Sequence, residues 1–433
     1  MALTKLTLRT ALATAISALL LASCGEANQS RSAASAAQAT PRGFNAERLA
    51  RLDEAMQAYI DQDRMVGATL IIMRDGQQAL SKAWGWRDKE ANDPMKEDSI
   101  FRIASQTKAL TSVGVMMLME EGKLLLEDPV GKYLPEWLET KVAVAKPGGY
   151  DVVPAKRAIT IRDLLTHTAG IPYNGGPARD AWLEAGILGW YFAEREESMT
   201  DVVKRMAALP MSAQPGEQFV YGYATDILGV VIETISDQSL DVFIAERLTN
   251  PLGMTDTHFC LPPEKAQRLA VVYSSFYGSV SRAGDPGVNS DGVHIGQGHY
   301  LNGPCKAFAG GAGLLSTTHD YARFLEMLRR GGELDGRRYI SRKSVELMTV
   351  DHLVEPNYPA GTGFGLGFRV ITDLGKHGRM ASEGEYSWGG AYHSTYWVDP
   401  KEGLGVVFLV QLIPTGDIDV QGKLRNLIYQ ALE

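Results

Sequence analysis

The chain has 433 residues, of which 45% are hydrophobic and 22% charged, proportions ordinary for a soluble globular protein with one large domain or two intertwined ones. Its formal net charge is −8, and no stretch of the chain is strongly basic. This balance argues against binding to nucleic acid or to anionic lipid head groups.

The first 23 residues have the pattern of a signal peptide. The short basic segment MALTKLTLRT precedes an apolar run, ALATAISALLLAS, which is too short to span a bilayer comfortably and ends in small residues. Cys24 follows, and residues 21–25 resemble a bacterial lipobox, in which the cysteine is lipidated. The resemblance implies an exported, membrane-anchored lipoprotein that faces the periplasm, with residues 24–43 as a flexible tether. A plain signal peptide with a coincidental cysteine is the alternative.

The segment after the tether predicts a helix, a hairpin and a second helix. Residues 46–63 have helical periodicity, and residues 67–86 form two strand-like runs around a turn at 74–76. Residues 102–123 are apolar nearly all round, which predicts a buried helix ending at Gly122.

Two polar side chains, Ser105 and Lys108, interrupt the first turn of this buried helix. Their i, i+3 spacing puts them on one face. In one hypothesis Ser105 caps the helix and Lys108 extends to solvent. In the other, Lys108 activates Ser105 as a nucleophile, and the helix N-terminus stabilises a developing oxyanion. An S-x-x-K match is weak by itself, because a chain of this length contains about one by chance.

The remaining elements predict an α/β (α+β) fold. Helical patterns at 201–209 and 224–237 lie among loops rich in glycine and proline, whereas the C-terminal part predicts a helix at 320–331 and strands at 363–371, 393–400 and 404–412. We therefore expect an antiparallel sheet built from both chain ends, about 44–125 and 305–433, flanked by helices. A mainly helical lobe, about 126–304, is expected to be inserted between them.

Two further stretches carry residues of chemical interest. In PGEQFVYGYATDILG, a tyrosine near a lysine is stabilised as a phenolate and can act as a base, although Tyr221 and Tyr223 taken alone fit packing better. In SWGGAYHSTYWVDP, the pair Gly389-Gly390 permits a close approach of backbone or ligand, or else forms a bulge or tight turn. We interpret His393 as structural or as a pocket wall, because the chain lacks a G-x-S-x-G motif.

The cysteine and histidine pattern predicts no metal site. Cys260 and Cys305 either pair as a disulfide, as export would allow, or remain buried thiols. His294 and His299 lie in a glycine-rich loop without a third ligand nearby, and we expect them to face solvent.

Taken together, the S-x-x-K, Tyr221 and Trp388-Gly389-Gly390 features, in this order, resemble the serine β-lactamase and penicillin-binding-protein superfamily. ITIRDLLTHTAGIP, LTNPLGMTDTHF and GGAGLLSTTHDYARFLEML add to the resemblance, which covers about residue 45 to the end. The class C β-lactamase-like branch is most similar, and within it the family VIII carboxylesterases. The resemblance implies a β-lactamase/transpeptidase-like fold for residues 44–433.

The resemblance also implies roles for individual residues. Ser105 matches the acylated nucleophile, Lys108 its partner and Tyr221 the base, while the backbone N–H groups of Ser105 and Ala391 would form an oxyanion hole. The expected substrate-binding residues are Tyr223, Trp388, Gly389 and Gly390.

Two departures from the family pattern bear on the substrate. Tyr223 stands where asparagine usually binds a substrate amide, and Trp388 stands where lysine usually binds a substrate carboxylate. An apolar wall at Trp388 favours neutral esters, as in family VIII, where W-G-G is common. We therefore expect a serine hydrolase that cleaves carboxylic esters, with a small-molecule ester or amide as substrate, no cofactor and no protein partner.

Three alternatives stay open at this point. One is a β-lactamase or a D-Ala-D-Ala carboxypeptidase or transpeptidase, acting on lactams or peptidoglycan peptides. Another is transfer of the acyl group to an alcohol or amine instead of water. The third, of another class, is a non-catalytic penicillin-recognition binding module, although a pure binder has no need of an activated nucleophile.

Overall fold

The computed structural model describes residues 43–276, 278–288, 293–353 and 358–433. The expected signal peptide, the tether up to residue 42 and Cys24 lie outside the described residues. All described residues belong to one unit, Thr40–Glu433. Within those ranges, no helix has the length and apolar character needed to cross a membrane.

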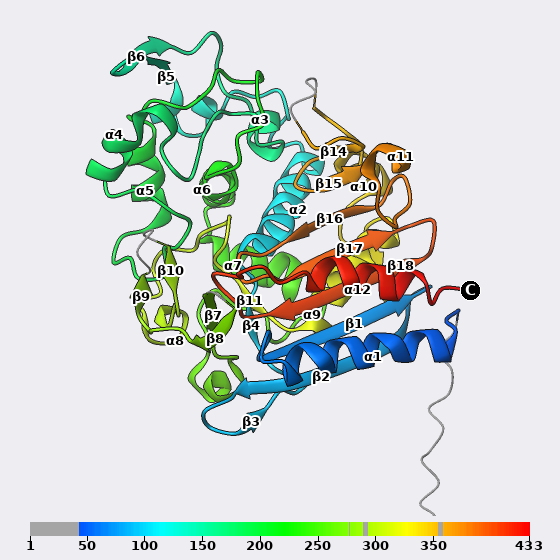
Figure 1. Ribbon diagram of the computed structural model, residues 1–433. Helices are drawn as coiled ribbons and strands as arrows, with labels where there is room; N and C mark the ends of the chain where they lie inside the picture. The colour runs from blue at the N-terminus through cyan, green and yellow to red at the C-terminus, as the bar shows by residue number, and fades with distance from the viewer. Residues whose placement is uncertain (1–42, 277, 289–292, 354–357) are drawn as a thin grey trace, which may run out of the picture. The chain divides into compact units, whose positions relative to one another are not determined.

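An eight-stranded antiparallel sheet combines strands from both ends of the chain (Figure 1). Its order is β14-β15-β16-β17-β18-β1-β2-β3. The strands are β1 Gly67–Arg74, β2 Gln77–Asp88, β3 Asp93–Pro94, β14 Thr362–Phe364, β15 Arg369–Ile371, β16 Tyr386–Gly389, β17 Thr395–Asp399 and β18 Leu404–Val410. Since β1 pairs directly with β18, the expectation of a sheet assembled from both chain ends is confirmed.

The central strand β1 shows why helices cover both faces of the sheet. Leu70 and Ile72 point to one face and pack with α1 (Ala46–Asp61) and α12 (Val420–Tyr429). Ile71 points to the other face, in the core that contains residues of α2 (Thr107–Glu120) and α9 (Thr318–Arg329). This alternation follows from the two-residue repeat of a strand and leaves α2 buried beneath the sheet (Figure 1).

The segment between β4 (Phe101–Arg102) with α2 and β11 (Leu315–Ser316) with α9 forms the mainly helical lobe (Figure 1). Its helices are α3 Ile161–Leu165, α4 Arg179–Glu184, α5 Met199–Met206, α6 Ala224–Ser236, α7 Leu240–Ile244 and α8 His299–Asn302. It also carries three strand pairs: β5 Lys141–Lys146 with β6 Gly149–Pro154, β7 Tyr273–Phe276 with β8 Ser279–Arg282, and β9 Gly287–Val288 with β10 His294–Ile295. The remaining short elements are β12 Glu333–Leu334, β13 Arg337–Arg338, α10 Arg342–Met348 and α11 Leu374–His377.

One predicted strand is wrong in its extent. Residues 363–371 form parts of two antiparallel strands, β14 and β15, instead of a single strand. The turn between them closes with the Gly365 N–H donating to the Phe368 carbonyl over 2.7 Å, and Gly367 has a φ of +98°. A side chain at Gly367 would be strained in that conformation and would meet Ser112, so this turn requires glycine.

Cysteine and histidine side chains of the lobe have defined partners. Cys260 and Cys305 form a disulfide with a Cα–Cα distance of 5.9 Å. The expectation that His294 and His299 face solvent is wrong, because both are half-buried around Tyr191. The Tyr191 hydroxyl lies 2.8 Å from Nδ1 of His299, which gives this imidazole a structural partner.

Candidate active site

Ser105 lies in a short 3₁₀ turn, Ala104–Gln106, that leads directly into α2. Ala104, immediately before it, has a φ of +44°, a conformation that residues with a Cβ rarely adopt. Strain of this kind gathers at functional sites, where surrounding packing maintains it. The chain therefore turns sharply just before Ser105.

The hypothesis of a helix cap and a solvent-facing lysine is wrong. Neither the 3₁₀ turn nor α2 has a side-chain cap, and Lys108 is only 2% exposed. Its ammonium donates to the Gly311 carbonyl at 2.8 Å and to the Tyr173 hydroxyl at 2.9 Å, and it lies 3.4 Å from the Ser105 hydroxyl. Since an ammonium has three donors and no acceptor, these three oxygens match its capacity.

Tyr221 lies over the same ammonium without a direct hydrogen bond to it. Lys108 Nζ is 4.6 Å from the centroid of the Tyr221 ring, a cation–π contact. The hydroxyl of Tyr221 accepts a hydrogen bond from Trp388 Nε1 over 3.0 Å. Two of the motifs singled out in the sequence, far apart in the chain, are thus joined beside Lys108.

A second tyrosine, Tyr173, was missed by the sequence analysis. It lies in the loop after α3, one residue beyond the stretch ITIRDLLTHTAGIP, and its hydroxyl is the one that Lys108 contacts directly. Burial raises the pKa of Tyr173 well above its ordinary value, and the negative charge of Asp226 raises it further. The Tyr173 hydroxyl is therefore held in its protonated form.

The expectation that Tyr223 binds substrate is not supported by its position. Its side chain is fully buried, stacked on Trp182 at a ring distance of 5.6 Å and edge-on to Tyr173 at 4.7 Å. Its hydroxyl donates to the Tyr173 carbonyl over 3.3 Å. A tyrosine is too large to share the small polar role of an asparagine here, so Tyr223 supports Tyr173 from behind.

The loop after β16 approaches the turn before Ser105. A Cβ on Gly390 would lie 2.5 Å from the Ile103 carbonyl oxygen, so only glycine allows this approach. Ala391 packs in the same small cluster as Ala104. In the described part of the chain, neither the Ser105 nor the Ala391 backbone N–H has a protein acceptor, which leaves both donors free for a ligand oxygen.

A buried imidazole, His167, completes the wall behind Tyr221. The two rings lie 4.7 Å apart, and His167 has a φ of +55°. Burial lowers the pKa of His167 well below its ordinary value, and the charge of Lys108 lowers it further. His167 is therefore neutral at physiological pH and adds no second cation to the site.

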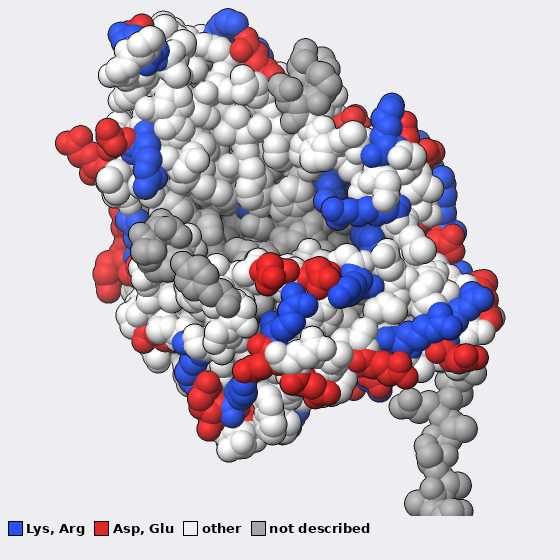
Figure 2. Space-filling model, in the orientation of Figure 1, with Lys and Arg blue, Asp and Glu red and all other residues white. Residues whose placement is uncertain are grey.

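The groups around Lys108 differ in their exposure to solvent. Ser105, Tyr173, Tyr221 and Trp388 are all partly exposed, whereas Lys108 is buried below them. Figure 2 shows a hollow between the helical lobe and the β16–β17 part of the sheet, with mostly uncharged residues on its visible walls. Such walls suit a substrate without a net charge at the reacting end.

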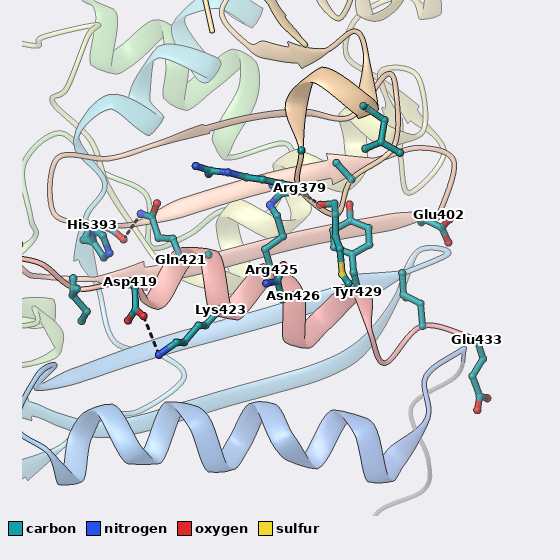
Figure 3. Close-up of a pocket in the computed structure, with 18 residues that line it drawn as sticks. Arg379, His393, Glu402, Asp419, Gln421, Lys423, Arg425, Asn426, Tyr429 and Glu433 are labelled. Atoms are coloured by element: carbon teal, nitrogen blue, oxygen red, sulfur yellow. Dashed lines mark hydrogen bonds and ion pairs between the residues drawn. The ribbon is translucent and has the colours of Figure 1, made fainter. Parts of the chain in front are cut away.

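A separate groove of about 1320 Å³ runs along α12 (Figure 3). His393 lines one end of this groove, where its carbonyl accepts a hydrogen bond from Gln421. Charged side chains such as Arg379, Lys423 and Asp419 border the groove. It contains none of the groups that surround Lys108, so the candidate site lies outside this groove.

Comparisons with known proteins found similarity along most of the chain. The family model described as Beta-lactamase matches residues 52–429. Protein Rv1367c of Mycobacterium tuberculosis is 34% identical over 84% of this chain and 90% of its own length. Esterase EstB of Burkholderia gladioli is 30% identical over 86% of this chain and 94% of its own. The solved structure of EstCE1, described as a hydrolase with promiscuous acyltransferase activity, matches 88% of this chain and 99% of its own, with 26% identity and a TM-score of 0.78.

Proposed function

Because the chain belongs to the beta-lactamase family of serine hydrolases, we propose that it cleaves carboxylic esters through an acyl-enzyme on Ser105. The observation that carries the proposal is the placement of the Ser105 hydroxyl 3.4 Å from a buried ammonium and beside two unpaired backbone N–H groups. A nucleophile, a charge that assists proton transfer and an oxyanion site are the parts that acyl transfer requires.

In the proposed acylation step, Ser105 Oγ attacks the ester carbonyl carbon and its proton passes to Tyr221. The Trp388 N–H lies 3.0 Å from the Tyr221 hydroxyl oxygen, and the Lys108 ammonium lies 4.6 Å from the centroid of its ring. The carbonyl oxygen becomes an oxyanion bound by the N–H groups of Ser105 and Ala391. The ester C–O bond then breaks, and Tyr221 returns the proton to the leaving alkoxide.

Deacylation reverses the roles, with water in place of the alcohol. Tyr221 accepts a proton from water, the resulting hydroxide attacks the acyl carbon, and the proton returns to Ser105 Oγ as the acid leaves. Tyr173 is the weaker candidate for this base, because its raised pKa keeps its hydroxyl protonated. We assign Tyr173 the role of orienting Lys108.

The preference for esters rests on Trp388. Its indole N–H is used by Tyr221, and its ring packs edge-on to Phe364 at 5.2 Å, so it presents an apolar surface where a lysine would offer a charge. Without that charge, an anionic lactam or peptide carboxylate loses a contact worth about 2 kcal/mol. EstB is named as an esterase and shares 30% identity with this chain, which supports the same direction.

A substrate panel tests the proposal. Purified protein is incubated with a p-nitrophenyl ester series centred on the butyrate and with a chromogenic cephalosporin, each with a Ser105→Ala control. We expect ester turnover that the substitution abolishes, and slower turnover of the cephalosporin. Parallel reactions with an added alcohol measure whether the acyl group passes to an acceptor other than water.

Other outcomes would select other functions. Faster turnover of the cephalosporin than of any ester would favour a lactam or peptide substrate. Absence of turnover, together with absence of a fluorophosphonate label on Ser105, would favour a non-catalytic binding module.

The N-terminal pattern supports a separate proposal about location. We propose that lipidation of Cys24 anchors the enzyme to a bacterial membrane, facing the periplasm, and that residues 25–43 are the tether. A Cys24→Ser variant should leave the membrane fraction and keep full ester turnover. Membrane association that survives the substitution would contradict the anchor.

A further inference from the structure

Asp226, in the first turn of α6, is a buried carboxylate that the mechanism above does not use. We propose that Asp226 is a positioning residue, which provides the negative charge for the Lys108 ammonium and fixes the peptide to which that ammonium donates. This inference rests on the proposed function, because it concerns the same Ser105 site.

The geometry connects Asp226 to Lys108 through one residue. Oδ1 of Asp226 accepts a hydrogen bond from the Gly311 N–H over 2.9 Å. The carbonyl of the same glycine accepts from Lys108 Nζ over 2.8 Å. A shift of Gly311 would therefore move the main acceptor of Lys108.

The loop that carries Gly311 lies against α6 with no space for side chains. A Cβ on Gly310 would lie 2.6 Å from the Thr225 carbonyl oxygen, and a Cβ on Gly311 would lie 2.5 Å from Oδ2 of Asp226. Real Cβ atoms do not approach other atoms so closely. The paired glycines of GGAGLLS are thus explained by the contact with Asp226, and the contact determines where the Gly311 carbonyl points.

The burial of Asp226 requires a compensating charge. The residue is 1% exposed, and Oδ2 has no hydrogen-bond partner in the described part of the chain. An unpaired carboxylate in such a place is costly unless a cation is near. A carboxylate that only favoured the N-terminus of α6 could stay in water and would not need this burial.

The charged and titratable groups around Asp226 identify the cation. Lys108 approaches from α2, and the phenols of Tyr173, Tyr223 and Tyr300 approach from the loop after α3, the start of α6 and α8. Burial raises the pKa of Asp226 to about 6, against the opposing effects of Lys108 and the Gly311 N–H. Lys108 is the one cation in this set, so the two charges compensate each other across the Gly311 peptide.

Thermal unfolding at mildly alkaline pH tests the pairing without any substrate. The set is the wild type, Asp226→Asn, Lys108→Met and the double variant. Asparagine keeps the acceptor for the Gly311 N–H and removes the charge. We expect Lys108→Met to lower the midpoint temperature of unfolding. The change in this midpoint caused by Asp226→Asn should be more positive by roughly 4 °C in the Lys108→Met protein than in the wild type. An equal effect in both backgrounds would overturn the pairing.

The rate of Ser105 acylation tests the positioning role. We expect Asp226→Asn to slow both p-nitrophenyl butyrate turnover and fluorophosphonate labelling of Ser105 by about tenfold. The fall of kcat/KM in the wild type below about pH 6, where Asp226 protonates, should disappear in the variant. If Asp226 had only a structural role, the fall of kcat/KM at acidic pH would be the same in the variant and in the wild type.

A matched control comes from the same helix. Glu233 accepts hydrogen bonds from the Leu240 N–H and the Thr200 hydroxyl, away from Lys108, and Glu233→Gln should keep the wild-type rate and pH profile. Unchanged rates in Asp226→Asn would overturn the positioning role. A wild type that neither turns over esters nor labels at Ser105 would contradict the proposed function, while the thermal comparison would still decide on the charge pair.

Discussion

Two buried cations on opposite faces of the sheet are held in different ways. Arg425, on α12, forms a direct ion pair with Glu385 at 2.6 Å and lies over the Trp397 ring at 4.5 Å. Glu385 is itself fully buried and also accepts from the Tyr429 hydroxyl. Lys108, on α2, contacts only neutral oxygens. The carboxylate of Asp226 is linked to it through the Gly311 peptide, whose N–H donates to Asp226.

The difference is between two charges in direct contact and two charges linked through a peptide group. In the Arg425 pair the guanidinium contacts one carboxylate oxygen of Glu385 directly, so each charge has its counter-ion in contact. Lys108 keeps a donor near the Ser105 hydroxyl and lies against the ring of Tyr221. The groove along α12 borders Arg425, whereas the candidate site surrounds Lys108.

The largest effect on activity is expected from substitution of one of the two tyrosines beside Lys108, Tyr221 and Tyr173. Tyr221→Phe removes the proposed base and should lower kcat by about 10³-fold. Tyr173→Phe leaves one donor of Lys108 without its acceptor and should cost about tenfold. Steady-state kinetics with p-nitrophenyl butyrate measures both, and the reverse order would make Tyr173 the base.

Removing the ion pair between Arg425 and Glu385 should lower the stability of the protein and leave its activity unchanged. Glu385→Gln leaves the Arg425 charge buried without its counter-ion and should lower the free energy of unfolding by about 3 kcal/mol. Urea unfolding measures the loss, and kcat of the folded variant should equal that of the wild type. A large fall in kcat would show that the two faces are coupled.

The pH dependence of stability should have opposite signs at Asp226, near Lys108, and at Asp419, beside the groove along α12. The pKa of Asp226 is about 6 in the folded protein against 3.8 for an ordinary aspartate, so its stabilising contribution is complete below 3.8 and is lost as pH rises through 6. The loss amounts to about 3 kcal/mol. Relative to the wild type, Asp226→Asn should therefore gain stability between about pH 4 and about pH 7.

Asp419, beside the groove, should show the opposite dependence. Hydrogen bonds from Tyr59 and Lys423 lower its pKa to about 2, so its contribution is present above 3.8 and is lost as pH falls through 2. Asp419→Asn should lose stability relative to the wild type at neutral pH, and the loss should shrink in acid. The urea midpoints of Asp226→Asn and Asp419→Asn, measured against the wild type across the pH range, test both predictions. A change in stability of the same sign in both variants at neutral pH would contradict them.

A smaller effect than that of Tyr221→Phe is expected at Trp388. Trp388→Phe keeps an apolar ring and removes the N–H that donates to Tyr221, so kcat/KM should fall by about tenfold, with the ester preference kept. A gain of cephalosporin turnover in this variant would mean that the indole itself excludes lactams.

The sequence predicted the sheet and the order of its motifs because both follow from local patterns. The strand-like apolar runs in residues 67–86 and 404–412 and the apolar stretch from Arg102 to Lys123 can be recognised from the sequence alone. The pair Ser105 and Lys108 could be recognised from i, i+3 spacing. Beyond local pattern, the resemblance to a known family linked them to Tyr221 and Trp388.

Contacts that depend on packing were not predictable in the same way. Tyr173 was missed because no spacing relates it to Lys108, which it meets only when the loop after α3 folds over α2. Tyr223 was expected to bind substrate because it stands at the asparagine position of the family motif, whereas its ring is buried in the core against Trp182. Nothing in the sequence indicated a role for Asp226, whose carboxylate accepts a hydrogen bond from the distant Gly311 N–H only in the folded chain.

The most direct test of the account is the mass of the enzyme during turnover. The wild type is quenched in acid while it hydrolyses p-nitrophenyl butyrate, and the intact protein and its peptides are weighed. The account predicts one added butyryl group, located on Ser105 and absent from Ser105→Ala. Turnover that persists in Ser105→Ala, or an acyl group on another residue, would contradict it.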